Sequence, residues 1–81
     1  MNITDTEIEK AIKKTHGNND FITSKYVMET ITDTPHEYPE ITRKNTPKQI
    51  KTLVTKYCLR QGWTREIETP TNAVFYRGKK R

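Results

Sequence analysis

The chain has 81 residues, of which 31% are apolar and 31% charged, with a formal net charge of +5. This length allows one small domain with a thin core. The sequence has no apolar run long enough to span a membrane, no signal-peptide pattern and a single cysteine, which together predict a soluble intracellular protein without disulfides.

Positive charge is concentrated in the middle of the chain. Residues 1–40 contain eight acidic and four basic residues, whereas residues 41–65 contain seven basic residues and no acidic one. Such segregation favours a polyanionic partner, of which nucleic acid is the commonest. A basic patch that merely faces solvent is the alternative.

The first predicted element is a helix from Ile3 to Thr15. Thr4 is its predicted N-cap, with Glu7 as the capping-box partner. Residues 16–20 are rich in Gly, Asn and Asp, a composition that predicts a turn.

A very short strand is predicted at Phe21 and Ile22, directly before a second helix. Thr23 is the predicted N-cap of that helix, which is expected to run from Ser24 to about Ile31.

The segment from Thr32 to Asn45 lacks helical periodicity and contains Pro35 and Pro39. It is predicted to be a loop with room for a single helical turn. Tyr38 and Ile41 are expected to pin this loop to the core.

The strongest local signal predicts a helix from Pro47 to Gln61. Thr46 and Gln49 form a capping box around Pro47, and Gly62 is the expected left-handed terminator. Apolar side chains recur at helical spacing on one face, namely those of Ile50, Leu53, Val54, Tyr57 and Cys58.

After Gly62 the periodicity changes to that of strands. Strands are predicted from Trp63 to Ile67 and from Ala73 to Arg77, joined by a turn from Glu68 to Asn72. The expected domain therefore covers residues 1–77, and residues 78–81 form a basic tail.

Motifs of catalysis or metal binding do not emerge from the sequence. Two histidines and one cysteine are too few and too scattered for a zinc site, and neither a Gly-rich phosphate loop nor a catalytic triad is recognisable. An enzyme is not expected, and no cofactor or metal is predicted. Trp63 is expected to pack in the core.

The order helix, short strand, helix, helix, strand, turn, strand resembles the winged helix-turn-helix family of DNA-binding domains. The residues that carry the resemblance are the run from Phe21 to Ser24, where a strand enters a capped helix, and the run from Leu59 to Trp63, where a helix enters the hairpin. The resemblance implies an α+β, mainly α fold with three helices and a C-terminal β-hairpin wing.

The same resemblance implies a double-stranded DNA-binding protein, such as a small transcriptional regulator or a nucleoid or viral DNA-binding protein, in the cytoplasm or nucleus. Its third helix would enter the major groove, where Gln49 is a candidate for an adenine edge. The implied nucleic-acid contacts are Arg43, Lys44, Thr46, Lys48, Gln49, Thr52, Lys56, Arg65 and Arg77.

Two departures from the family pattern and two alternatives stand beside this interpretation. The connection before the third helix is long, and Glu66 and Glu68 make the wing acidic. A winged-helix module for protein interaction or replication is one alternative, with a homodimer or a larger assembly as partner. Binding of single-stranded nucleic acid or RNA through Trp63, Phe75, Tyr76 and the basic tail is the other.

Overall fold

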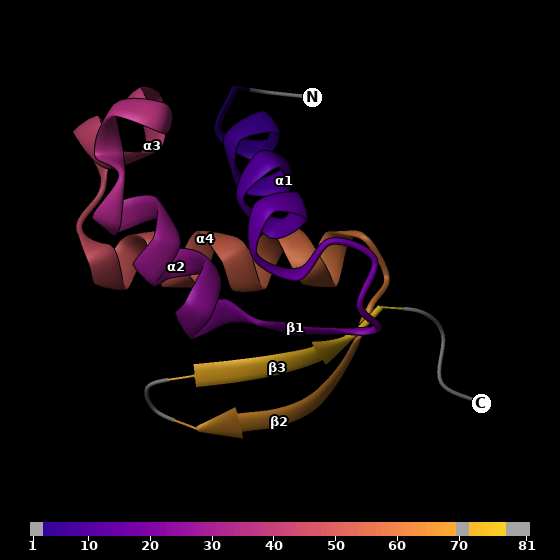
Figure 1. Cartoon of the computed structure of the whole chain (residues 1–81). Helices are drawn as coiled ribbons and strands as arrows, with labels where there is room; N and C mark the ends of the chain where they lie inside the picture. The colour runs from indigo at the N-terminus through magenta and orange to yellow at the C-terminus, as the bar shows by residue number, and fades with distance from the viewer. Residues whose placement is uncertain (1–2, 70–71, 78–81) are drawn as a thin grey trace.

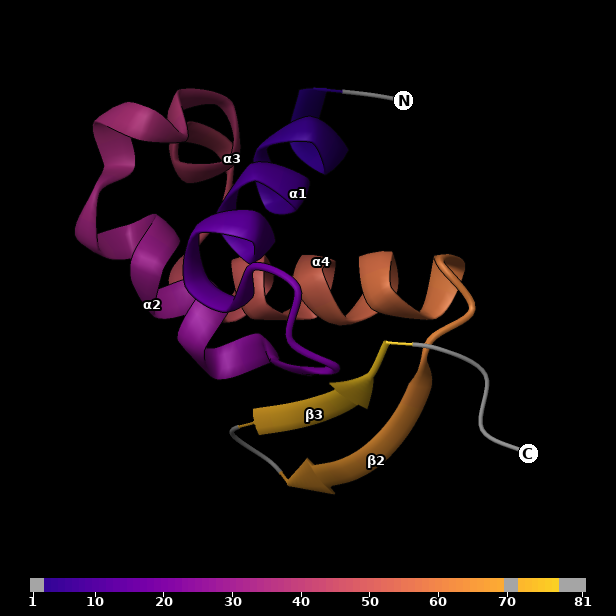
Figure 2. The ribbon, with the colours of Figure 1, turned by 45° about the vertical axis from the view of Figure 1, so that its right-hand side comes forward.

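The computed structural model describes residues 3–69 and 72–77 and has an α+β, mainly helical fold (Figure 1). In both views the helices gather on one side of the three strands (Figures 1 and 2). The elements are, in chain order, α1 (Ile3–His16), β1 (Phe21–Thr23), α2 (Ser24–Asp33), the 3-10 helix η1 (Pro35–Glu37), α3 (Pro39–Lys44), α4 (Pro47–Arg60), β2 (Thr64–Thr69) and β3 (Asn72–Tyr76).

The three strands form an antiparallel sheet in the order β1-β3-β2, so the last strand lies between the other two. Ile22 is paired with Phe75, and both side chains are fully buried. A β-bulge interrupts β2 between Arg65 and Ile67. The sheet therefore joins residues 21–23 to the hairpin formed by residues 64–69 and 72–76.

The predicted start of α1 at Ile3 is confirmed, but the predicted N-cap is wrong. Thr4 lies inside the helix, so it is not the N-cap. Glu7 does not form a capping box with it, and its carboxylate instead accepts hydrogen bonds from the backbone N–H groups of Glu40 (3.2 Å) and Ile41 (2.7 Å). Glu7 thus ties α1 to the first turn of α3, where orphan N–H groups need acceptors.

The position of Thr23 as N-cap of α2 is confirmed, but its side chain makes no capping hydrogen bond. Asn72, at the start of β3, takes that role, because its Oδ1 accepts from the backbone N–H of Lys25 at 3.0 Å. In return, Ser24 Oγ accepts from the backbone N–H of Ala73 at 2.9 Å. These bonds fasten the hairpin to the start of α2.

The segment between the second and third predicted helices was predicted as a loop with room for a single helical turn, but it contains two short helices, so the count of three helices is wrong. Residues 35–37 form η1 and residues 39–44 form α3, each with proline at its first turn, where a missing N–H costs nothing. Tyr38 and Ile41 are both fully buried, which confirms that they pin this segment to the core.

The signals at both ends of α4 are confirmed. Thr46 Oγ1 accepts from the backbone N–H of Gln49, and Gln49 Oε1 accepts from that of Thr46. At the other end Gly62 has φ +80°. The N–H of Gly62 bonds to the carbonyl of Leu59, and that of Trp63 to the carbonyl of Cys58, which is a Schellman motif.

The hairpin differs from its prediction at the turn. Glu68, Thr69 and Asn72 belong to the strands, so the connection is shorter than the predicted turn over residues 68–72. Thr69 Oγ1 accepts from the backbone N–H of Asn72 at 3.1 Å and closes the ladder there. Pro70, Thr71 and the predicted basic tail lie outside the described residues.

The core lies between the helices and one face of the sheet. Among the described residues it consists of Ile8, Ala11, Ile12, Ile22, Val27, Ile31, Tyr38, Ile41, Ile50, Val54, Tyr57, Cys58, Ala73 and Phe75. Trp63 packs against this cluster at its edge, with its ring 6.0 Å from that of Tyr57.

Candidate nucleic-acid interface

The outer face of α4 carries exposed polar and basic side chains, opposite the buried face formed by Ile50, Val54 and Cys58. Lys48, Thr52 and Lys56 follow one another at intervals of four residues, so they form a stripe roughly 12 Å long. Within the described part of the chain, neither Lys48 nor Lys56 has an ion-pair partner. Both ammonium groups are therefore available to an anionic ligand.

Two shallow hollows flank this stripe. One, of about 320 Å³, lies along α4 and is lined by Asn45, Lys48, Gln49, Thr52, Leu53 and Lys56. The other, of about 230 Å³, lies between α4 and the hairpin, where Lys51 and Thr55 face Glu68 and Thr69. Lys48 and Thr52 line both hollows and form the ridge between them.

The capping box limits what Thr46 and Gln49 can offer to a ligand. Both residues are exposed, but Gln49 Oε1 already accepts from the backbone N–H of Thr46 at 2.8 Å. A two-bond contact with adenine needs both ends of the glutamine amide. With the box intact, the amide nitrogen is the group left to contact a ligand.

The hydroxyl groups on α4 are also engaged by the helix. Thr52 Oγ1 donates to the carbonyl of Lys48 at 3.2 Å, and Thr55 Oγ1 donates to that of Lys51 at 3.1 Å. The remaining donors on the outer face are the ammonium groups of Lys48 and Lys56 and the Gln49 amide. Such a face suits ligands rich in acceptors, such as phosphates and guanine edges.

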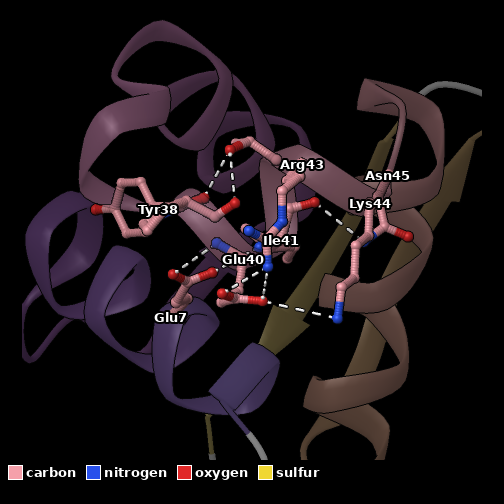
Figure 3. Close-up of polar contacts among 9 residues, drawn as sticks. Glu7, Tyr38, Glu40, Ile41, Arg43, Lys44 and Asn45 are labelled. Atoms are coloured by element: carbon pink, nitrogen blue, oxygen red, sulfur yellow. Dashed lines mark hydrogen bonds and ion pairs between the residues drawn. The ribbon is translucent and has the colours of Figure 1, made fainter.

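Arg43 and Lys44 lie in the last turn of α3, beside α4, and both contact Glu40 (Figure 3). Arg43 Nη2 donates to both carboxylate oxygens of Glu40 at 2.8 Å. Lys44 Nζ lies 3.7 Å from Glu40 Oε2. These two positive charges are thus partly neutralised before any ligand arrives.

The two remaining predicted contacts, Arg65 and Arg77, already have partners of their own. Arg65 Nη1 lies 3.2 Å from Glu68 Oε2 on β2. Arg77 donates to the carbonyl of Gly17 at 2.8 Å, and its guanidinium carbon lies 5.4 Å from the centre of the Trp63 ring. Arg77 therefore has a structural role, and it lines a different hollow together with Tyr57 and Trp63.

Sequence reasoning missed two residues of the larger hollow. Asn45 ends α3 by donating from its amide to the carbonyl of Ile41 at 3.0 Å, and Leu53 is only partly buried. The spacing of Leu53 assigned it to the buried face of α4, where it lies at the margin. Asn45 carried no signal, because the helix that it caps was not predicted.

Other chemistry finds little support among residues 3–69 and 72–77. No group of three or more His, Cys, Asp and Glu residues that could hold a metal ion occurs there. Burial raises the pKa of the Cys58 thiol to about 12, so a reactive thiolate is not formed near neutral pH. None of the helices in this part of the chain is long and apolar enough to cross a membrane.

Comparisons with models of known protein families, with curated proteins and with solved structures give no match to this chain.

Proposed function

We propose that the chain is a winged-helix domain that binds double-stranded DNA and inserts α4 into the major groove. The observation that carries this proposal is the outer face of α4, a helix that contains no acidic residue. On this face Lys48 and Lys56 have no ion-pair partner among residues 3–69 and 72–77. An α-helix fits the width of the major groove, and lysines on its exposed side neutralise phosphates or contact guanine.

The arrangement of the other elements supports the same proposal. In a winged helix the recognition helix is followed by a hairpin whose second strand also pairs with a short strand from the start of the domain. Here α4 is followed by β2 and β3, and β3 pairs with β1. The hairpin end faces α4 across the smaller hollow, where a wing would meet the backbone of the duplex.

The proposed roles follow from the contacts on the page. Lys48 and Lys56 bind the duplex directly, with Gln49 donating from its amide nitrogen. Arg43 and Lys44 bind phosphate groups once their contacts with the Glu40 carboxylate are broken. A small transcriptional regulator, or a nucleoid or viral DNA-binding protein, fits such a domain.

The direct test is a double substitution, Lys48→Gln with Lys56→Gln, assayed by fluorescence anisotropy on a labelled random duplex. Each phosphate contact contributes about −0.9 to the slope of log K against log salt concentration. The variant should therefore bind about tenfold more weakly in low salt and lose roughly 1.8 from that slope.

Lys13→Gln with Lys14→Gln is the matched control, because it removes the same charge from α1, where these lysines contact Glu9 and Glu37 instead. Equal losses in the two variants would mean that only net charge matters and that α4 has no special role.

A wild-type chain that fails to bind duplex in low salt would favour the protein-interaction alternative. Leu59, which is 47% exposed near the end of α4, is the apolar side chain available for such a contact.

A further inference from the structure

The larger hollow on α4 contains an apolar patch formed by Leu53. Among the described residues that line this hollow, Leu53 is the one with an apolar side chain. It packs against the core and is only partly buried. The hollow has a volume of about 320 Å³, several times the roughly 30 Å³ that a water molecule occupies. The edge of a planar ring can therefore enter it and reach Leu53.

Gln49 and Lys56 are neighbours of Leu53 on this side of α4. They lie four residues before it and three residues after it, and all three side chains line the hollow. On a helix surface, residues at these spacings have Cβ atoms about 5–6 Å apart. A single group bound in the hollow can therefore contact Leu53 and form a hydrogen bond with Gln49.

The capping box decides which kind of hydrogen bond Gln49 offers. Its Oε1 accepts from the backbone N–H of Thr46 at 2.8 Å, and its own backbone N–H donates to Thr46 Oγ1 at 3.3 Å. The side chain is thus held at both ends of the box, with the amide nitrogen left as a donor. A side chain that is already held loses less conformational entropy when it binds a ligand. Next to the apolar patch, the hollow therefore offers a positioned donor.

The charges around the patch restrict what can fill the hollow. Lys48 and Lys56 both line it, and neither has an ion-pair partner among residues 3–69 and 72–77. An uncharged apolar segment of a protein would cover Leu53 but leave both ammonium groups without partners. A nucleic acid duplex supplies both features, because its base edges lie between two rows of phosphates.

Thymine is the base whose edge matches this combination. In the major groove it presents the O4 acceptor beside the C5-methyl group, whereas adenine, guanine and cytosine have no methyl group there. 5-Methylcytosine shares the methyl group, but its N4 amino group is a donor and would oppose the amide nitrogen of Gln49. A donor beside an apolar side chain therefore favours thymine.

We propose that the larger hollow on α4 binds the major-groove edge of thymine, with Leu53 against the C5-methyl group and the Gln49 amide donating to O4. Lys48 and Lys56 bind the flanking phosphates. This inference rests on the proposed binding of duplex DNA by α4 and adds a base preference to it. It differs from the adenine contact expected for Gln49 from sequence, and it gives Leu53 a role in specificity.

The first test compares two labelled twenty-base-pair duplexes by anisotropy with the full chain. One consists of A·T pairs, and in the other uracil replaces every thymine, which removes only the methyl groups. The wild type should bind the thymine duplex about three- to fourfold more tightly, as expected for one buried methyl group. Leu53→Ala should reduce this ratio to nearly one. Leu59→Ala is the matched control, because it makes the same change on α4 outside the hollow and should keep the wild-type ratio.

The second test exchanges the donor for an acceptor. In Gln49→Glu the new carboxylate can still accept from the backbone N–H of Thr46, so the capping box is kept. Its other oxygen, however, is an acceptor and suits the N4 amino group of 5-methylcytosine. Relative to the wild type, the variant should shift its preference from the A·T duplex toward one of G·5-methylcytosine pairs by about threefold or more. Because both affinities are measured on one variant, a general loss caused by the added negative charge cancels.

Each outcome has one meaning. Equal binding of the thymine and uracil duplexes by the wild type overturns the thymine contact and leaves duplex binding by α4 in place. A wild type that binds neither duplex overturns both proposals. A thymine preference that is unchanged in folded Leu53→Ala overturns the role of Leu53, and an unchanged preference in Gln49→Glu overturns the contact with O4. Circular dichroism checks the fold of each variant, and the wild-type comparison decides the proposal even if Leu53→Ala does not fold.

Discussion

Glu40 controls how much charge the α3–α4 junction offers to a ligand. Its carboxylate accepts two hydrogen bonds from Arg43 and lies near Lys44, so in the proposed complex it would compete with a phosphate group for both side chains. Both basic side chains are about two-thirds exposed, and exposed ion pairs of this kind are weak. A phosphate can therefore displace Glu40 at a small cost.

Glu40→Gln should consequently tighten duplex binding about two- to fivefold and steepen its salt dependence. Anisotropy titrations at several salt concentrations measure both quantities. Glu29→Gln is the matched control, because it changes the net charge equally from an exposed position on α2. An equal gain in the control would show that net charge, and not release of Arg43 and Lys44, is responsible.

His16 couples the fold to pH at the end of α1. Its Nε2 accepts from the backbone N–H of Thr23 at 3.2 Å, and its Nδ1 lies 2.6 Å from Thr15 Oγ1. If the ring were protonated, Nε2 would carry a hydrogen and could no longer accept from the backbone N–H of Thr23. Burial, together with the charge of Arg77, lowers the pKa of His16 below its ordinary value of 6.5.

A lowered pKa means that the unfolded chain binds the proton more readily than the folded one. Stability is then complete above about pH 6.5 and falls as the pH drops below that value. We expect thermal melts of the wild type to lose stability as the pH falls below about 6.5, and His16→Gln to flatten this dependence. His36→Gln, at an exposed position, should keep the wild-type slope, and a His16→Gln variant with an unchanged slope would contradict the assignment.

At the scale of elements, α4 and α3 show what sequence can and cannot reveal. The signals that begin and end α4 lie within or next to the helix, from Thr46 to Gly62, so local patterns predict it almost to the residue. Helix α3 has six residues and is held by Glu7, more than thirty positions earlier. No local pattern contains that contact, which is why the segment was predicted as a loop.

The same difference between local signals and long-range contacts explains which parts of the candidate site could be predicted from sequence. The stripe of Lys48, Thr52 and Lys56 follows from helical periodicity alone. The pairing of Arg43 with Glu40, the place of Arg77 beside Trp63 and the exposure of Phe21 depend on how distant segments pack. Sequence therefore locates the basic helix but not which of its neighbours are free to bind.

Substitutions at the two helix starts should differ in cost. Thr46→Ala removes one capping acceptor from an exposed end and should cost about 1 kcal/mol, or a fall of roughly 4–8 °C in Tm. Glu7→Ala leaves two backbone N–H groups of α3 without their acceptor and should cost about 2 kcal/mol or more. Thermal melts followed by circular dichroism compare the two, and a Glu7→Ala melt no lower than that of Thr46→Ala would contradict the role given to Glu7.

For the whole molecule, β3 is the element that closes the fold. It pairs with β1 on one side and β2 on the other, its Phe75 and Ala73 belong to the core, and Asn72 caps α2. Losing a buried phenylalanine alone costs about 3–5 kcal/mol. A domain of this size has a free energy of unfolding of only about 4–12 kcal/mol.

A chain that ends at Thr69 should therefore show no cooperative thermal transition, because β1 loses its partner and the core loses two side chains at once. A chain that ends at Arg77 retains β3 and should melt cooperatively, within a few degrees of the full sequence. It should still bind duplex through α4, because every residue of that helix is retained. Calorimetry and anisotropy on the two shortened chains measure these outcomes, and a cooperative transition in the chain that ends at Thr69 would show that the helices fold without the sheet.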